Sequence, residues 1–143
     1  MTAYLLDVNV LIALIDGAHI HHEIAHKWFA NVGNKAWATC PLTENAVVRI
    51  VGNSRYPNSR GTPAAVAEVI MDLLALPGHV FWPDDVSLFN TPIVEISRLL
   101  NSRQVTDSYL LALACAHDGL FATFDRRVAT DAVRGGSTRV HLI

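Results

Sequence analysis

A short apolar run that ends in a carboxylate lies near the start of the sequence and constrains the fold more than any other feature. Tyr4, Leu5 and Leu6 precede Asp7, and helical periodicity begins at once in residues 10–15. An apolar run of this length, bounded by polar residues, is typical of a strand buried on both faces. The segment therefore predicts a strand, an acidic tip and a helix. Asp7 is expected at the sheet edge where open α/β folds bind ligands.

The same alternation of strand and helix patterns continues along the chain. Further strands are predicted at residues 35–39, 79–82, 120–123 and 139–143, the last at a sheet edge. Helices are predicted at residues 19–32, 41–51, 62–76, 91–100 and 106–117, with a short one after residue 127. Thr62 and Thr91 are each followed by proline, which indicates an N-cap and a first helical turn. Thr106 is expected to cap the helix that has Asp107 in its first position.

Strands that alternate with helices imply right-handed crossovers and a parallel sheet. The chain has 143 residues, of which 51% are hydrophobic, and this is enough to bury one core. No repeat or linker divides it. We therefore expect an α/β fold with a single domain over residues 1–143. Its central, mostly parallel sheet would have four or five strands, with helices on both faces.

Charge and cysteine content narrow the location and the partners. The formal charge of −2 predicts no strong bulk attraction to nucleic acid, but nine of the eleven basic residues are arginines, which bind phosphate well. Metal ions that neutralised four carboxylates would leave the remaining surface at +2, so RNA binding stays open. No apolar run approaches the ~18 residues of a membrane span. Cys40 and Cys115 lie in apolar surroundings, which favours a reducing cytoplasm over a disulfide framework.

Acidic residues recur where the carboxyl edge of a parallel sheet is expected. Asp7 follows the first strand, Asp125 follows the strand at 120–123, and Asp107 begins a helix. Glu44 lies in the first turn of its helix, on the side that the strand ends would face. Two carboxylates ~4 Å apart repel by about 4 kcal/mol at an effective dielectric constant of 20, so four of them together need protons or cations. Oxygen ligands favour Mg²⁺ or Mn²⁺ over Zn²⁺, and such a site supports phosphodiester hydrolysis.

Four segments, in this order and spacing, resemble the PIN-domain ribonucleases, and most closely the small bacterial toxins of the VapC type. They are residues 6–11, Leu42-Thr43-Glu44, Val105-Thr106-Asp107 and Thr123-Phe124-Asp125. The resemblance implies a Mg²⁺- or Mn²⁺-dependent endoribonuclease that is silenced by a cognate antitoxin protein and forms a homodimer. It makes Asp7, Glu44, Asp107 and Asp125 the catalytic, metal-binding carboxylates. The expected products carry a 5′-phosphate and a 3′-hydroxyl.

Further residues of the site follow from the same comparison or from position. The resemblance implies that Asn9 orients Asp7 or a bound water, and it matches Thr123 to a small hydroxyl residue two positions before the last aspartate. Arg126 and Arg127 directly follow a proposed ligand, so they either anchor the phosphates of the substrate or lie in a solvated helix start. Arg49 lies about a turn beyond Glu44 and is a further phosphate-binding candidate.

Three other functions compete with the nuclease interpretation. His22 and His26 have the i, i+4 spacing of a zinc site, but no third ligand follows at helical spacing. An aspartyl-phosphate phosphatase needs a general acid two residues after Asp7, and Asn9 cannot donate a proton in that role. A catalytically silent nuclease-like module that binds a partner protein or RNA remains open, although four intact carboxylates are hard to explain under it.

Overall fold

A computed structural model of the chain describes residues 1–59 and 61–143. In these residues five short strands form one sheet in the order β3-β2-β1-β4-β5, and every neighbouring pair is parallel. The strands are β1 (Tyr4–Leu6), β2 (Trp37–Thr39), β3 (His79–Phe81), β4 (Leu120–Thr123) and β5 (Val140–Leu142). The expected parallel α/β sheet is confirmed, with β1 at its centre and β5 at an edge.

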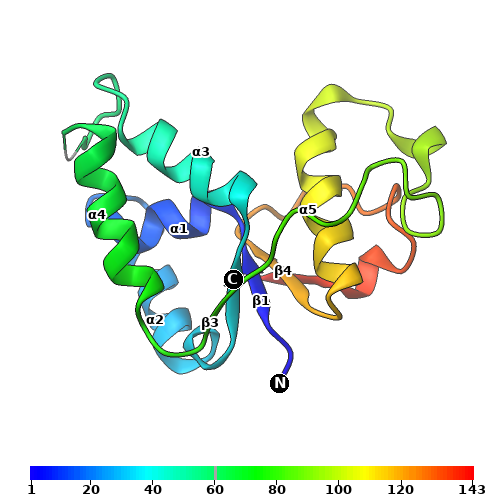
Figure 1. Cartoon of the computed structure of the whole chain (residues 1–143), viewed down its shortest axis with the longest axis horizontal. Helices are drawn as coiled ribbons and strands as arrows, with labels where there is room; N and C mark the ends of the chain where they lie inside the picture. Colours follow the sequence, from blue (N-terminus) through cyan, green and yellow to red (C-terminus); the bar gives the residue numbers. More distant parts are fainter. Residues whose placement is uncertain (60) are drawn as a thin grey trace.

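Helices cover both faces of this sheet, as expected. They are α1 (Val8–Ile15), α2 (His22–Asn31), α3 (Pro41–Val51), α4 (Pro63–Leu74) and α5 (Val105–Ala116). Short 3₁₀ helices lie at Gly33–Lys35, Ile96–Arg98, Ser102–Gln104 and Gly136–Thr138. In Figure 1, α1 to α4 gather on one side of the sheet and α5 lies on the other. None of the described helices is long and apolar enough to cross a membrane.

Alternate residues of β1 supply the two hydrophobic cores. Leu6 packs in the core formed with α1 to α4, whereas Leu5 packs in the core formed with α5. Both side chains are fully buried because successive residues of a strand point to opposite faces. The same alternation places Ala122 in the first core and Phe121 in the second. The central strands are therefore buried on both faces, as the unbroken apolar runs predicted.

Two helix starts match their sequence signals. Asp7 is the N-cap of α1, and its Oδ1 accepts a hydrogen bond of 2.7 Å from the backbone N–H of Val8. Thr62 is the N-cap of α4, with its hydroxyl oxygen 3.2 Å from the Ala65 nitrogen that donates to it. Asp7 therefore has a structural role at the strand end in addition to its predicted chemistry.

The prediction of a helix over residues 91–100 is wrong. Val94 is fully buried and pairs with Val133 in an isolated antiparallel bridge. The backbone N–H of Glu95 donates to the Ala132 carbonyl (2.8 Å), and the Arg134 N–H donates to the Ile93 carbonyl (2.9 Å). Because long-range partners take these groups, a continuous helical ladder does not form, and a 3₁₀ turn at Ile96–Arg98 takes its place.

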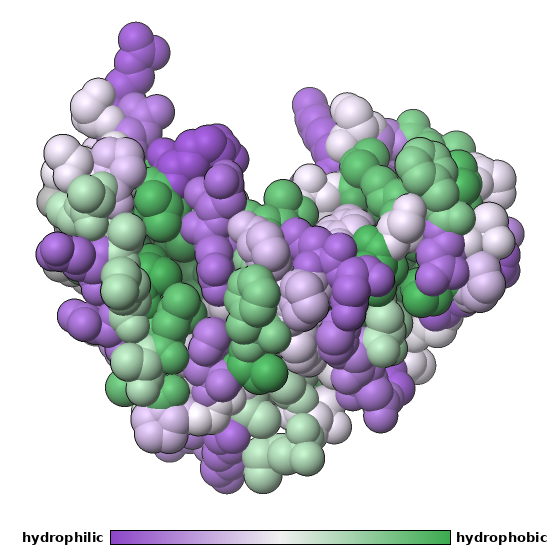
Figure 2. Space-filling model, in the orientation of Figure 1, coloured by the Kyte–Doolittle hydropathy of each residue, from purple (hydrophilic) through white to green (hydrophobic). Residues whose placement is uncertain are grey.

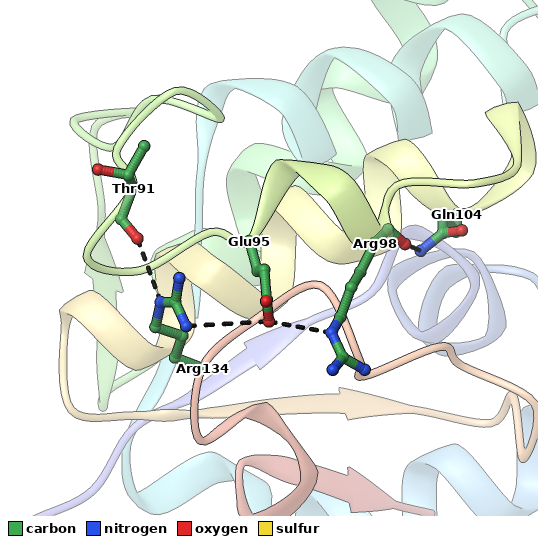
Figure 3. Close-up of polar contacts among 5 residues, drawn as sticks. All are labelled: Thr91, Glu95, Arg98, Gln104 and Arg134. Carbon is green, nitrogen blue, oxygen red and sulfur yellow. Dashed lines mark hydrogen bonds and ion pairs between the residues drawn. The ribbon is translucent and has the colours of Figure 1, made fainter.

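Side-chain ion pairs and hydrogen bonds also hold residues 91–98 in place. In Figure 3 the Glu95 carboxylate lies between two guanidinium groups, 3.0 Å from Arg98 and 3.8 Å from Arg134. Arg134 also donates to the carbonyl of Thr91, and the Gln104 amide donates to the carbonyl of Arg98. The irregular segment before α5 is thus tied to the 131–134 region and to the start of α5.

Two smaller expectations are also corrected. Thr106 does not cap α5, because a 3₁₀ helix with a capping box between Asn101 and Gln104 leads directly into it at Val105. Asp107 is consequently the third residue of α5. No helix directly follows residue 127 in the described part of the chain, where a 3₁₀ turn comes only at Gly136–Thr138.

Candidate active site

The carboxyl ends of β1 and β4 bring Asp7 and Asp125 to the same edge of the sheet. The register pairs Leu6 with Ala122, so the acidic residues follow neighbouring strands. Thr123 joins them: its hydroxyl donates to Asp7 Oδ2 (2.8 Å), and its oxygen accepts the backbone N–H of Asp125 (3.1 Å). Parallel pairing and one buried hydroxyl therefore fix the position of Asp7 relative to the loop that carries Asp125.

Asp7, Asp107 and Asp125 border one cavity of about 290 Å³. Helices on both sides of the sheet complete its wall, and the remaining lining residues are Val8, Asn9, Leu42, Thr43, Ala46, Arg49, Ile50, Thr106 and Leu110. Figure 2 shows the molecule hollowed between the part that contains α3 and α4 and the part that contains α5. The cavity thus has an acidic floor between walls from α3 and α5.

The pKa values of two of these carboxylates are raised. Burial, followed by the negative charges of Asp7 and Asp125, raises the pKa of Asp107 to about 6. Burial also raises the pKa of Asp7, to which the charge of Asp125 adds, although the hydrogen bonds from Thr123 and Val8 act in the opposite direction. Carboxylates that resist ionisation in this way are characteristic of functional sites, because a bound cation would relieve their repulsion.

Comparison with known proteins agrees with this geometry. Residues 4–133 match the PIN domain. The chain belongs to the PIN-domain family. Curated relatives from Mycobacterium tuberculosis are Ribonuclease VapC44 (46% identity over 142 residues, 96% of each chain) and Ribonuclease VapC39 (43% over 135 residues, 94% of this chain and 96% of the relative). Ribonuclease VapC38 is 40% identical over 139 residues, which cover 97% of this chain and 96% of the relative. The resemblance to VapC-type PIN domains is confirmed.

The donor atoms at the cavity of this PIN domain fit a hard divalent cation. Three carboxylates, whose oxygens Mg²⁺ and Mn²⁺ prefer as ligands, line it together with Arg49. Within residues 1–59 and 61–143, no three His, Cys, Asp or Glu side chains are grouped closely enough to form a ready coordination set. Asp7 is held by two hydrogen bonds, from the backbone N–H of Val8 and from the hydroxyl of Thr123.

Glu44 differs from the other three carboxylates in its contacts. It is not among the described residues that line the cavity. Its Oε2 instead accepts a hydrogen bond of 2.6 Å from the hydroxyl of Thr39, at the end of β2. The structure of the PIN domain therefore places three of the four predicted ligands around one cavity, and the metal-binding role of all four stays a prediction.

The other predicted residues lie around the cavity. Asn9 and Arg49 are exposed and contribute to its lining. Arg126 and Arg127 are exposed on the turn after Asp125, and the backbone N–H of Arg127 donates to Asp125 Oδ1 (2.8 Å). Their side chains are thus available to a substrate at the acidic edge, and phosphate contact remains a prediction for all three arginines.

The histidines at the start of α2 have a structural role in this PIN domain. His22 Nδ1 lies 2.7 Å from the carbonyl oxygen of Ala13, and His26 Nε2 lies 2.8 Å from that of Leu14. Both rings therefore bind carbonyls that the end of α1 leaves without helical partners. This pairing explains their i, i+4 spacing without a zinc ion.

Sequence reasoning missed the polar residues beside Glu44. Thr39 is fully buried, and its hydroxyl oxygen lies 2.7 Å from His79 Nε2. A signal was present: Thr39 ends β2 as Thr123 ends β4, so each strand places a hydroxyl beside an acidic residue. His79 gave no such signal, because its contact with Thr39 depends on the pairing of β2 and β3.

Proposed function

We propose that the chain is a Mg²⁺- or Mn²⁺-dependent endoribonuclease and the toxin of a type II toxin–antitoxin pair, acting in the cytoplasm. The observation that carries this proposal is the group of Asp7, Asp107 and Asp125 around one cavity, where burial and mutual repulsion raise the pKa values of Asp7 and Asp107. The relatives that bear the name ribonuclease support RNA as the substrate.

Each group of the cavity has a role in this proposal. Divalent cations, when bound, supply an activated water and stabilise charge on the attacking and leaving oxygens of an in-line displacement. Asp7, Asp107 and Asp125 would hold the cations, joined by Glu44, while the Thr123 hydroxyl keeps Asp7 in one orientation. Arg49, Arg126 and Arg127 would bind the substrate phosphates. Cleavage would leave a 5′-phosphate and a 3′-hydroxyl.

The proposed partners are a cognate antitoxin protein and a second copy of the chain. Ile20 and Ile24, near the start of α2, are 87% and 52% exposed. Exposed apolar residues of this kind are candidates for a protein interface, and the early helices are the surface we propose for the homodimer. Cys40 and Cys115 are both free thiols.

Replacement of Asp7 by asparagine tests the catalytic proposal. We expect Asp7→Asn to lower cleavage of total RNA at least about 100-fold, because the charge that would hold the cation is lost while the side-chain shape is kept. Cleavage is measured with Mg²⁺ or Mn²⁺ and again with a chelator. Asp72→Asn, at an exposed position of α4, is the matched control.

The outcomes separate the two functions left open by the sequence. Equal cleavage by wild type and Asp7→Asn, or cleavage that a chelator does not reduce, would reject the proposed mechanism. A folded wild-type protein that binds RNA or a partner but cleaves nothing would favour the silent binding module. Co-purification with the product of the neighbouring gene tests the toxin assignment, which predicts a small protein that blocks cleavage.

A further inference from the structure

A partly buried series of hydrogen bonds connects three elements next to the cavity. Thr39, the last residue of β2, is fully buried, and its hydroxyl donates to Glu44 Oε2 in the first turn of α3 (2.6 Å). The same hydroxyl oxygen lies 2.7 Å from His79 Nε2, at the start of β3. The Trp37 ring, 4.6 Å from the imidazole between centroids, packs against His79. Glu44 is thus held by groups that belong to two neighbouring strands.

The number of available protons determines which group donates each of these hydrogen bonds. A threonine hydroxyl has one proton, and Thr39 donates it to the Glu44 carboxylate. Thr39 can therefore meet His79 only as an acceptor, so Nε2 of His79 must carry a proton. Each donor polarises the next group, which strengthens the bond that reaches Glu44.

Glu44 lies on a different side of α3 from the residues of that helix that line the cavity. Leu42 and Ala46 line the cavity, and each is two residues from Glu44, which is about 160° around a helix. Helical side chains lean toward the N-terminus, and Glu44 has no complete turn before it. Its carboxylate therefore reaches the end of β2, where it binds Thr39, and it would have to leave that hydroxyl to turn toward the cavity.

We propose that Thr39 and His79 are positioning residues that hold Glu44 outside the cavity, and that Glu44 joins the other carboxylates around a divalent cation only when this hold is released. The inference rests on the proposed metal-dependent function. It explains why three carboxylates already border the cavity while the fourth is bound elsewhere. Because the hydrogen bond and the cation compete for one carboxylate, removal of the hydroxyl should strengthen cation binding.

The proton positions give a test that needs neither metal nor RNA. Nitrogen NMR of the histidine rings in the wild-type protein should show a protonated Nε2 at His79, and the resonance should shift in Thr39→Val. An unprotonated Nε2 would mean that Thr39 donates to His79 instead of Glu44, and this result would overturn the proposal. Because wild type alone is sufficient for the first reading, the test holds even for a variant that does not fold.

Binding of Mn²⁺ tests the competition. We expect Thr39→Val, which keeps the shape of the side chain, to bind Mn²⁺ about tenfold more tightly than wild type, as loss of one hydrogen bond to a charged group predicts. Thr39→Ser keeps the hydroxyl and should bind as wild type does. His79→Phe removes only the polarising donor and should tighten binding about twofold. Binding is measured by calorimetry on variants whose circular dichroism matches that of wild type.

Glu44→Gln completes the cycle. The gain from Thr39→Val should vanish when Glu44 is already glutamine, because the affected carboxylate is absent. Unchanged or weaker Mn²⁺ binding in Thr39→Val, or a gain that persists without Glu44, would overturn the proposal. These readings do not depend on RNA cleavage. If the Mn²⁺-binding results are as expected but no form of the protein cleaves RNA, the proposed restraint on Glu44 is supported and the proposed ribonuclease activity is rejected.

Discussion

At the scale of single residues, one hydroxyl group forms hydrogen bonds with two acidic residues. Thr123 is almost fully buried and uses both hydrogen-bonding functions of its side chain, one toward Asp7 and one toward the backbone of Asp125. Removing it would leave the Asp7 carboxylate with less compensation for its burial. The side chain therefore maintains both the orientation and the charge of the most buried acidic residue in the cavity.

Replacement of Thr123 by valine should lower RNA cleavage about 10- to 100-fold, the usual effect of removing a partner that orients a metal ligand. Because the hydrogen bond from Thr123 lowers the pKa of Asp7, its loss should also raise that pKa further. The pH dependence of cleavage should then shift toward higher pH. Thr123→Ser keeps the hydroxyl and should retain most activity, and equal losses in both variants would contradict this role.

Asp107 should make the stability of the metal-free protein depend on pH. Its pKa is about 6 in the folded state, against 3.8 for the unperturbed group. Below pH 3.8 the residue is protonated in both states, and its favourable contribution to folding is lost as the pH rises to about 6. Asp107→Asn should therefore raise the melting temperature at about pH 8 but not at about pH 4.

Thermal unfolding of both proteins in the presence of a chelator measures this difference. Asp131→Asn, at an exposed position outside the cavity lining, is the control. A gain of the same size at both pH values would show that ionisation of Asp107 is not its cause. Added Mg²⁺ should stabilise wild type more than Asp107→Asn, because the cation compensates the charge that the variant lacks.

At the scale of elements, local signals predicted most of the framework. Asp7 and Thr62 marked helix starts because capping depends on neighbouring residues, and the run at 120–123 was long enough to identify β4. The same local logic failed at Thr91–Pro92. There, a bridge to Val133 supplies the backbone partners, and no pattern within residues 91–100 reveals so distant a partner.

The predicted site divides in the same way. The carboxyl ends of parallel strands lie at the same edge of the sheet, so the positions of Asp7 and Asp125 could be predicted from the order of elements. The side-chain direction of Glu44 could not, because it depends on a hydroxyl of β2 and an imidazole of β3. The position of Glu44 in the first turn of a helix could be predicted from local sequence signals. The contact that its side chain makes could not, because it depends on residues of other strands.

Val94 should matter more to this irregular segment than the ion pairs around Glu95. Val94→Ala removes buried methyl groups and should lower the free energy of unfolding by about 2 kcal/mol. Glu95→Gln breaks partly exposed ion pairs and should lower it by less than about 1 kcal/mol. Urea denaturation measures both values, and a larger loss in Glu95→Gln would make the ion pairs the main anchor.

At the scale of the whole molecule, the proposed substrate RNA is a polyanion, whereas the cavity proposed to bind it is acidic. The net charge of −2 gives little general attraction, so binding depends on where the arginines lie. Arg49 contributes to the cavity wall, and Arg126 and Arg127 follow Asp125. Positive charges thus flank the carboxylates on α3 and on the turn after β4, which gives a phosphate backbone two places to bind.

Loss of these arginines should weaken RNA binding through its electrostatic part. In an Asp7→Asn background, which prevents cleavage, Arg49→Gln, Arg126→Gln and Arg127→Gln should each reduce affinity for single-stranded RNA. The slope of log K against log salt should fall by about 0.7 for each phosphate that the protein no longer neutralises. Lys27→Gln, at an exposed position of α2, is the control, and a slope that does not change would exclude the mutated arginine from phosphate binding.

The hydrogen bond between Thr123 and Asp7 joins residues that are 116 positions apart, so it can form only after both have been synthesised. A ribosome makes Asp7 116 residues before Thr123. A nascent chain consequently lacks an assembled acidic cavity until β4 and the residues after it have been made. The proposed nuclease would therefore be inert toward its own messenger up to that point, and the proposed inhibitor would not be needed before β4 emerges.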